Sequence, residues 1–343
     1  MGVTLMGNEF LTLGIETSCD ETAAAVVKDG REVLANVVSS QVEWHKKFGG
    51  VVPEIAARKH IEFINPVLEE ALGEAEIDFS DLDLTAVTYG PGLVGGLLVG
   101  IAAAKSVSYA HDIPLLGVNH IEGHIYASVL SYPKLKPPLV CLTVSGGHTD
   151  LLYFEELGEY EVLGSTSDDA AGEAFDKVAR VLEIGYPGGP AVERLAWDGD
   201  SEAIDFPRPL IEEGYDFSFS GLKTAVLNYI NNSQQRGERI SKANLAASFQ
   251  QAVVDVLVKK AVRAAKDKEV DQVVVVGGVA ANKKLRSDLK KRLERLGIEL
   301  YYPDFKLCTD NAAMIASAGY FCWQAGVAET SYSLNADPNL KLG

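Results

Sequence analysis

The fold of this chain follows from a stretch near its midpoint, Leu139-Val140-Cys141-Leu142-Thr143-Val144, and from the Ser145-Gly146-Gly147-His148 that comes after it. The apolar and β-branched residues predict a buried strand, and the small polar residues predict a turn. A second strand is expected over residues 149–154, followed after a short turn by a third over 160–163. The stretch therefore opens a unit of three strands joined by turns.

The same plan occurs once before, near the N-terminus. A buried strand is expected over 11–16, a polar turn over 17–21, and further strands over 22–27 and 33–38. In both halves strands then alternate with helical patterns, which is typical of an α/β protein. Internal duplication on this scale predicts two related lobes, an N-terminal one over 1–130 and a C-terminal one over 131–343. A ligand is expected to bind in a cleft between them.

Apolar periodicity predicts helices over 53–72, 93–109, 170–182 and 245–266, and a further helix over about 312–330. The last of these is a candidate to pack back on the N-terminal lobe. Asp168 or Asp169 is expected to cap the helix over 170–182. Residues 198–218 are expected to be irregular.

The charge of the chain is acidic overall but unevenly distributed. A net charge of −17 over 343 residues argues against unaided binding of nucleic acid by bulk attraction. Two basic clusters hold 12 of the 31 lysines and arginines and are either solvated helix faces or a docking strip for a polyanion. Their members are Lys259, Lys260, Arg263, Lys266 and Lys268 in the first, and Lys283, Lys284, Arg286, Lys290, Lys291, Arg292 and Arg295 in the second.

Nothing in the sequence indicates a membrane or an oxidising compartment. Residues 1–10 do not resemble a signal peptide, and no apolar run reaches the length needed to span a bilayer. The cysteines, Cys19, Cys141, Cys308 and Cys322, are far apart and form no CxxC pair, so reduced thiols are expected. We therefore expect a cytoplasmic protein.

A candidate metal site is formed by Asn119-His120-Ile121-Glu122-Gly123-His124 together with a distant carboxylate. On a helix, His120 and His124 lie one turn apart on the same face, so they could share one ion or be two hydrogen-bonded histidines. Asp310 stands just before the expected helix at 312 and is a plausible third ligand. Two histidines and one carboxylate leave open positions, which suits iron(II) or a catalytic zinc.

Three turns suggest a nucleotide site. Ser145-Gly146-Gly147 and Gly277-Gly278 each follow a strand, where main-chain amides can approach a phosphate, and Thr17-Ser18 offers hydroxyls at the equivalent place in the first half. Asp176 and Asn282 are then candidate partners for ribose hydroxyls or a base. No Walker-type lysine motif and no GxGxxG are present, which argues against P-loop and Rossmann folds.

The motifs together resemble one family over nearly the whole chain. The resemblance rests on residues 14–22, 89–92, 119–124, 144–149, 172–177, 217–224, 277–282 and 308–312. In these segments the chain is similar to the TsaD family of tRNA threonylcarbamoyladenosine transferases, and most of all to its bacterial branch.

The resemblance implies an actin-like (ASKHA, duplicated RNase H-like) fold of two lobes. It implies transfer of a threonylcarbamoyl group from threonylcarbamoyl-AMP to the exocyclic amine of the adenosine 3′ to the anticodon, in tRNAs that read ANN codons, with release of AMP. One divalent metal per subunit, iron with zinc as the alternative, would be held by His120, His124 and Asp310. It would polarise the carbamoyl carbonyl or hold the threonyl part. No general base is assigned. The implied adenylate-site residues are Thr143, Val144, Ser145, Gly146, Gly147, Asp176, Gly189, Glu193 and Asn282.

The implied partners are tRNA, TsaB-like and TsaE-like proteins, and a TsaC-type protein that supplies the adenylate. The helix expected over 53–72 is a candidate surface for pairing with a TsaB-like protein, and a homodimer is also possible. Two other functions remain open at this point. One is a metallopeptidase, although Glu122 does not occupy the position that the glutamate has in HExxH. The other is an ATP-binding kinase or binding module of the actin type, in which Glu16 or Asp20 could serve as a carboxylate base.

Overall fold

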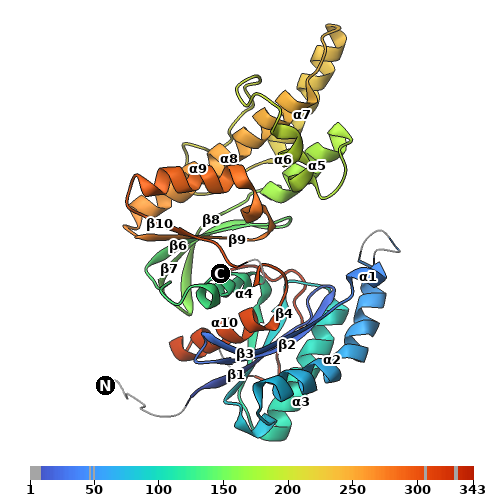
Figure 1. The fold of residues 1–343 in the computed structure, drawn as a ribbon, viewed down its shortest axis with the longest axis vertical. Coiled ribbons are helices and arrows are strands. Elements are labelled where there is room, and N and C mark those ends of the chain that lie inside the picture. Colours follow the sequence, from blue (N-terminus) through green and yellow to red (C-terminus); the bar gives the residue numbers. More distant parts are fainter. Residues whose placement is uncertain (1–8, 46–47, 49–50, 305–306, 328–330) are drawn as a thin grey trace. The chain divides into compact units, whose positions relative to one another are not determined.

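The computed structural model describes residues 9–45, 48, 51–304, 307–327 and 331–343 (Figure 1). Residues 1–8, and residues 328–330 of the expected last helix, lie outside this part. The chain forms two compact units. Unit 1 comprises residues up to 136, residues 156–159 and residues from 303 onward, and unit 2 comprises 137–155 and 160–302.

Unit 1 is built on a sheet of five strands in the order β3-β2-β1-β4-β5. β1 runs antiparallel to β2 and parallel to β4, which in turn is parallel to β5. The mixed sheet therefore begins with the predicted run of three strands and is extended by two parallel ones. Its strands are β1 (Leu11–Glu16), β2 (Glu21–Lys28), β3 (Glu32–Ser40), β4 (Leu84–Gly90) and β5 (Leu115–Asn119).

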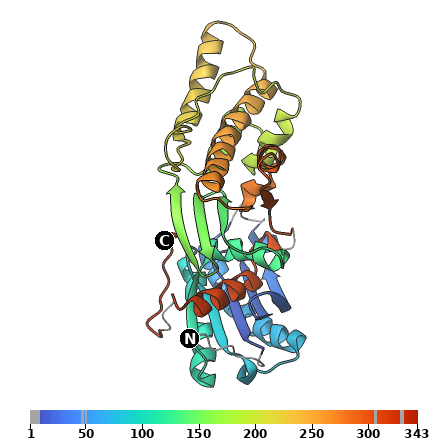
Figure 2. The ribbon, with the colours of Figure 1, turned by 90° about the vertical axis from the view of Figure 1, so that its left-hand side faces the viewer.

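Helices cover both faces of this sheet, as the alternation of apolar residues in β2 requires (Figures 1 and 2). Ala23, Ala25 and Val27 pack with α10 (Ala312–Ala325), whereas Ala24 and Val26 belong to the core on the other face. That second face is covered by α2 (Pro53–Ala75) and α3 (Val94–His111). Both sides of the central strands are consequently buried.

The close seat of α10 on the sheet depends on a glycine in β1. A Cβ atom on Gly14 would lie 2.2 Å from the Ala312 carbonyl oxygen and 2.7 Å from the Ala316 amide nitrogen. Any side chain here would meet backbone atoms of α10, so the helix could not keep its position. The position of the helix start, which carries Asp310 just before it, therefore rests on this close approach.

Unit 2 repeats the topology of unit 1. Its sheet has the order β8-β7-β6-β9-β10, which is the order of unit 1 with each strand replaced by its counterpart in the second half. β6 is antiparallel to β7 and parallel to β9. The predicted duplication is confirmed. The strands are β6 (Leu139–Val144), β7 (Thr149–Glu156), β8 (Glu159–Ser165), β9 (Gln272–Val276) and β10 (Glu299–Tyr301).

The main core of unit 2 lies between this sheet and a layer of helices. Val140, Leu142 and Val144 of β6 point into a core that also holds most of the buried residues of α8 (Lys242–Asp267). α8 packs in turn against α6 (Gly188–Ala196) and α9 (Lys283–Glu294), and α5 (Ala171–Leu182) packs against α6 and α7 (Ser220–Gln235). The short 3₁₀ turn η3 (Gly278–Ala281) joins β9 to α9.

The structure corrects one local expectation and adds two helices. α5 has Ala170 at its N-cap with no side-chain cap, so the prediction that Asp168 or Asp169 caps it is wrong. Asp168 instead accepts hydrogen bonds from the start of α7, 50 residues away, where Phe219 N lies 2.8 Å and Ser220 N 3.2 Å from its Oδ1. The helices α6 and α7 were not predicted.

The unit boundaries differ from the expected lobes of 1–130 and 131–343. The first unit runs on to residue 136 and takes back residues from 303 onward, including α10. The physical reason is that α10 packs on β1, β2 and β4, so the last helix covers one face of the sheet with which the chain began, as the sequence suggested.

Two further expectations bear on the environment of the protein. Cys19, Cys141, Cys308 and Cys322 are free thiols. In the part of the chain that the structure describes, no helix combines the length and the apolar composition required to span a bilayer.

Candidate metal centre and nucleotide pocket

The two histidines are placed by the junction between β5 and α4 (His120–Ser131). β5 ends at Asn119, whose side-chain oxygen accepts a hydrogen bond of 2.9 Å from Ile121 N and so starts the helix. His120 is the first residue of α4 and His124 lies one turn further on. The predicted i, i+4 placement on a helix is therefore what the structure contains.

Asp310 reaches the histidines because α4 packs closely against α10. A Cβ atom on Gly123, between the two histidines, would lie 2.6 Å from Cδ1 of Ile315 in α10. Asn311 caps α10 by accepting from Met314 N at 3.1 Å, and its amide donates to Thr309 O at 2.8 Å. These bonds hold the turn that carries Asp310 at the N-terminus of α10.

The three side chains converge on one point. Nε2 of His124 lies 3.2 Å from Nε2 of His120 and 3.2 Å from Oδ1 of Asp310, and Nε2 of His120 lies 3.4 Å from the same oxygen. Donors separated in this way subtend angles of roughly 100–110° at an ion about 2.1 Å from each, which is a normal metal–ligand distance. The group could hold one divalent ion on one side and leave its other side open.

A buried carboxylate that the sequence did not assign to this centre orients His120. Oε2 of Glu16, at the end of β1, lies 3.0 Å from Nδ1 of His120, and Ser18 Oγ lies 3.1 Å from the same nitrogen. Glu16 is itself held by Ser18 N and by the Thr88 hydroxyl, each at 2.5 Å. A carboxylate on Nδ1 fixes the tautomer that presents Nε2 to a metal.

The charges around the centre shift its pKa values in opposite directions. Burial lowers the pKa of His120, but Glu16, and to a lesser extent Asp310 and Glu21, outweigh burial and raise it to about 9. Burial raises the pKa of Asp310, but His124 and His120 outweigh that effect and lower it to about 2. Burial, then Asp20 and Asp310, raise the pKa of Glu21 to about 8. This excess of carboxylates favours a bound cation.

Unit 2 contains a separate pocket of about 360 Å³ between α5, α6 and the β9–α9 turn. Of the nine residues predicted for the adenylate site, five line it: Gly146, Asp176, Gly189, Glu193 and Asn282. Phe175, Pro190 and Val279 give it an apolar wall. Most of the predicted nucleotide-site residues are thus brought together from elements far apart in the sequence.

The other four predicted residues lie at or behind the β6–β7 turn. Thr143 and Val144 are buried in β6. The hydroxyl of Ser145 accepts hydrogen bonds from His148 N at 3.0 Å and Gly147 N at 3.3 Å, so it closes the turn on itself. The predicted phosphate-binding amides of this turn therefore have an internal acceptor, which a phosphate would have to displace.

The polar groups of the pocket also have structural partners. Asp176 Oδ1 accepts from Gly188 N at 2.7 Å and so fixes the start of α6. Glu193 Oε1 accepts from Lys283 N at 2.6 Å. Asn282 caps α9 by accepting from Leu285 N at 3.0 Å, and its amide donates to Gln250 at 2.9 Å. Asn282 thus shapes the pocket with most of its hydrogen-bonding capacity already used.

The third turn expected to bind a nucleotide is occupied by internal contacts. Thr17 donates its hydroxyl hydrogen bond to Gly96 O at 2.9 Å, and Ser18 Oγ faces His120. Both side chains are buried. The turn is equivalent to the β6–β7 turn in topology, and the polar group that it directs at a candidate site is the Ser18 hydroxyl, which contacts His120.

Some lining residues of the pocket were missed as site residues. Gly172, Tyr186 and Pro187 line the pocket without having been assigned to it, whereas Gly278 belongs to the Gly277-Gly278 turn that the sequence had already indicated. Gly172 lies within the motif over 172–177, and Tyr186 and Pro187 lie in a turn over 185–190 that is rich in glycine and proline. What the sequence lacked was the packing of α6 on α5, which brings that turn to the pocket.

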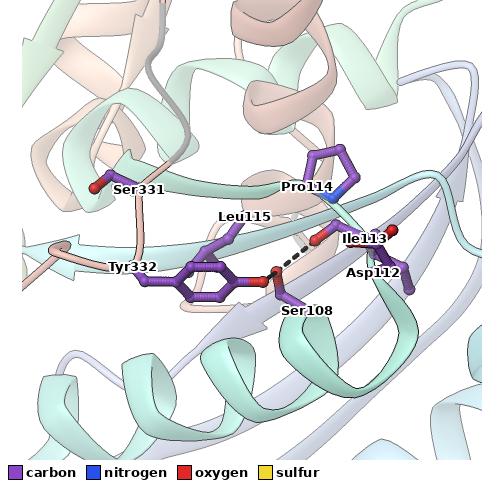
Figure 3. A pocket seen from close by; sticks show the side chains of 7 residues that line it. All are labelled: Ser108, Asp112, Ile113, Pro114, Leu115, Ser331 and Tyr332. Atoms are coloured by element: carbon purple, nitrogen blue, oxygen red, sulfur yellow. Dashed lines mark hydrogen bonds between the residues drawn. The ribbon is translucent and has the colours of Figure 1, made fainter.

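Unit 1 also contains a cavity, of about 240 Å³, at the end of α3 (Figure 3). Ser108 there donates to the Ile113 carbonyl oxygen, and its hydroxyl lies 3.1 Å from the Tyr332 hydroxyl. Tyr332 comes from the C-terminal segment. The close-up shows these polar groups turned toward one another, so the cavity serves to hold that segment and carries no group set up for chemistry.

The fold and the two candidate sites define a class of protein. The chain is an α/β protein with a duplicated, actin-like (ASKHA) topology, one unit of which carries a His-His-carboxylate centre and the other a glycine-lined pocket. A family model described as tRNA N6-adenosine threonylcarbamoyltransferase (TsaD) matches residues 32–317. The chain belongs to this family, which is a family of transferases.

Close relatives match over essentially the full length. A protein of that name from Caldicellulosiruptor saccharolyticus is 59% identical over 332 residues, which cover 97% of this chain and 98% of the relative. One from Geobacillus thermodenitrificans is 58% identical over 344 residues and covers 100% of both chains. One from Clostridium botulinum is 57% identical over 332 residues, 96% of this chain and 97% of its own.

Distant solved structures share the fold alone. Thermococcal HypF (T. kodakarensis) matches 92% of this chain and 48% of its own with a TM-score of 0.65 at 18% identity. Component A of the (R)-2-hydroxyglutaryl-CoA dehydratase of Acidaminococcus fermentans matches 91% of this chain and 98% of its own with a TM-score of 0.52 at 18% identity.

Proposed function

We propose that this chain transfers the threonylcarbamoyl group of threonylcarbamoyl-AMP to the exocyclic amine of the adenosine 3′ to the anticodon, in tRNAs that read ANN codons, with release of AMP. The observation that carries the proposal is the His-His-carboxylate centre braced by Glu16, in a chain that belongs to the transferase family. The function named for the full-length relatives supports the same reaction.

We propose His120, His124 and Asp310 as ligands of one divalent metal per subunit, Fe²⁺ with Zn²⁺ as the alternative. Their mutual distances of 3.2–3.4 Å support this assignment. When bound, such an ion supplies Lewis acidity toward a carbonyl or carboxylate oxygen. Glu16 keeps the proton of His120 on Nδ1 and so holds Nε2 toward the ion.

We propose that the adenylate is bound by Thr143, Val144, Ser145, Gly146, Gly147, Asp176, Gly189, Glu193 and Asn282. Support comes from the five of these residues that line one pocket. Within it, the apolar wall suits an adenine ring, and Asp176 suits the ribose hydroxyls, because one of its oxygens is not engaged by Gly188 N. Glu193 and Asn282 would act by keeping α6 and α9 in place.

We further propose that the enzyme acts in the cytoplasm with TsaB-like and TsaE-like proteins and a TsaC-type supplier of the adenylate. Two actin-like lobes, corresponding to the two units, are part of the proposal. The exposed Ile61 of α2, and the exposed Trp44, whose ring centre lies 4.2 Å from Nζ of Lys59 in α2, support α2 as the surface that pairs with a TsaB-like protein. A homodimer is the alternative assembly. Such apolar side chains are typical of interfaces.

The alternatives have less support. A peptidase would require a glutamate directed at the metal-bound water, but Glu122 is buried and its Oε1 accepts from Cys322 Sγ at 3.1 Å. A kinase would require a free carboxylate base, and the carboxylate of Glu16 is already engaged by Ser18, Thr88 and His120. The kinase alternative also leaves the convergence of the two histidines unexplained.

A transfer assay tests the proposal. The purified chain, together with its proposed partner proteins, is given threonylcarbamoyl-AMP and unmodified tRNA, and modified adenosine is measured. Product that is lost in the His120→Ala/His124→Ala variant would support the reaction and the metal site together. Product that persists in this variant would remove the metal from the mechanism, and no product with any set of partners would overturn the proposed function.

A further inference from the structure

The two basic clusters of the sequence behave differently in the structure, although both lie on helices of unit 2. The cluster on α8 is used internally. Nζ of Lys260 donates to the Glu213 and Gly214 carbonyl oxygens at 2.6 and 3.2 Å, and Arg263 donates to Gly214 O at 2.9 Å. Lys259 pairs with Glu212, and Lys268 with Glu161. These charges hold the irregular segment before α7 in place.

The cluster on α9 faces solvent instead. Leu285, Leu289 and Leu293 form the buried stripe of the helix. Lys284, Lys291 and Arg295 recur at intervals of seven and four residues, and therefore follow one line on the opposite side. Lys291, Arg292 and Arg295 are exposed, and none has an ion-pair partner among the residues that the structure describes. Two other basic residues of α9 form ion pairs within the helix itself, Lys284 with Asp288 and Lys290 with Glu294.

The local charge of α9 is opposite to that of the chain. Between Lys283 and Arg295 seven basic residues stand against two acidic ones, a net charge of +5 in a chain of −17. A polyanion is repelled by most of such a surface and attracted where the local potential is reversed. We refer to Lys284, Lys290, Lys291, Arg292 and Arg295 as the α9 strip.

The strip begins beside the nucleotide pocket. Asn282, which caps α9, lines the pocket, and Glu193, which also lines it, accepts from Lys283 N. Nζ of Lys283 lies 4.7 Å from the ring centre of Trp197, whose side chain is 67% exposed. An exposed indole beside cations is the combination with which proteins bind unpaired RNA bases. From there α9 extends for about 18 Å at 1.5 Å per residue.

We propose that the α9 strip is the docking surface on this chain for the phosphate backbone of the substrate RNA. The proposal rests on the proposed function and adds to it the place where the tRNA is held. Lysine and arginine contacts to phosphates position a nucleic acid without reading its sequence. That property suits an enzyme that must accept several tRNAs with a shared anticodon-loop feature. The unpaired state of Lys291, Arg292 and Arg295 means that binding phosphates would break no internal ion pair.

The test is an RNA-binding measurement on Lys291→Ala/Arg292→Ala/Arg295→Ala. The matched control, Lys134→Ala/Arg236→Ala/Arg239→Ala, removes the same charge from exposed positions elsewhere. The probe is an unmodified transcript of one tRNA that reads an ANN codon. Its Kd is measured between about 50 and 200 mM salt, for the full chain alone and with its partner proteins. At 0.1 M salt the α9 variant is expected to bind the transcript at least about tenfold more weakly than the wild type. The slope of log K against log salt is expected to become shallower by about 2–3, because each phosphate contact contributes about 0.7–0.9 to that slope.

Two further measurements separate docking from folding. Lys291→Arg/Arg292→Lys/Arg295→Lys keeps the charges and is expected to keep the wild-type slope, and AMP binding by the pocket is expected to be unchanged in all three variants. An unchanged slope in the alanine variant, or an equal loss in the control, would overturn the proposal. Wild-type transfer with an unaltered KM for tRNA in the alanine variant would overturn docking and leave the function standing. RNA binding through the strip without any transferred product would support docking and would overturn the proposed function.

Discussion

At the scale of single residues, Glu16 determines how His120 can act. It lies 3.0 Å from Nδ1, on the side away from Asp310, and is fully buried. Glu16→Gln removes the negative charge but keeps the shape, so metal affinity is expected to fall about 10- to 100-fold, as for other partners of metal-bound histidines. Competition with a chelator measures this. The control is Glu32→Gln, an exposed residue at the edge of the same sheet, which is expected to leave the affinity unchanged.

Metal binding is expected to depend on pH through His120. The pKa of about 9 means that the metal-free protein carries a proton on this imidazole at pH 7, and a metal can bind only after that proton leaves. Affinity should therefore rise by about one decade per pH unit up to about pH 9 and then level off. Asp310, with a pKa of about 2, stays ionised throughout. Calorimetry in buffers of different ionisation enthalpy would detect the released proton, and its absence would contradict this account.

Residue spacing was enough to indicate the histidine pair but not the group that orients it. His120 and His124 follow from a local rule of the helix, and Asp310 from its place before a helix start. Glu16 is 104 residues from His120 in sequence, and their contact depends on β1, β4 and β5 lying in that order in the sheet. No local pattern contains this order. The same holds for Asn282, whose amide is engaged by a residue of α8.

At the scale of elements, the close packing of α10 against β1 can be tested at Gly14. Gly14→Ala places a methyl group against backbone atoms of α10, so the free energy of unfolding is expected to fall by about 1–3 kcal/mol. Metal affinity is expected to fall with it, because Asp310 directly precedes α10. Gly73→Ala is the matched control, since a Cβ atom there meets nothing within 4 Å inside α2. It is expected to be neutral or to stabilise by up to about 1 kcal/mol. Urea denaturation distinguishes the two.

The start of α7 depends on a carboxylate from outside that helix. Asp168 accepts from Phe219 N, Ser220 N and the hydroxyls of Ser218 and Ser220. Asp168→Ala is expected to lower the free energy of unfolding by about 1–2 kcal/mol. Burial raises the pKa of Asp168, but these donors outweigh burial and lower it. The contribution is therefore present above pH 4 and lost as the pH falls through the lowered pKa. A difference between wild type and variant that is the same at pH 7 and at pH 2.5 would contradict this.

The strands were predictable and some helices were not, for a physical reason. The repeated order of strand, polar turn and strand is a short-range pattern, and it gave the first three strands of both sheets. α6 is nine residues long and begins in a Gly/Pro turn, so its helical character comes from packing on α5 and α8 more than from its own sequence. α7 has few buried residues, which leaves a weak apolar period.

At the scale of the whole molecule, the metal centre and the nucleotide pocket belong to different units and share no residue. His120→Ala/His124→Ala is expected to abolish metal binding and to leave AMP affinity within about twofold, because sites without shared partners behave additively. Asp176→Ala is expected to weaken AMP binding roughly tenfold and to leave metal affinity unchanged. Calorimetric titration of both ligands into both variants measures this, and a loss of both ligands in either variant would contradict it.

The division of the chain was only partly visible in the sequence. Duplication located the start of the second sheet at Leu139 correctly, because each half opens with the same pattern. The return of residues from 303 onward to unit 1 depends on the fit of small residues on α10, such as Ala312 and Ala316, against Gly14. The sequence made the last helix a candidate to pack back on the N-terminal lobe, and α10 does pack on β1, β2 and β4. The close fit itself is a property of two surfaces, and the sequence of either one alone does not reveal it.

The late position of α10 also has a consequence for biosynthesis. The ribosome completes α4 at Ser131 and must add nearly 200 residues before α10 has left it, which takes roughly 10–40 s at about 5–20 residues per second. During that interval Ala23, Ala25 and Val27 are not covered by α10, and His120 and His124 lack the carboxylate of Asp310. Unit 2 is complete by residue 302 and can fold first. The half of the protein that is made first is therefore the half that matures last, and a nascent chain halted anywhere before residue 312 would present an open apolar sheet face to chaperones and proteases.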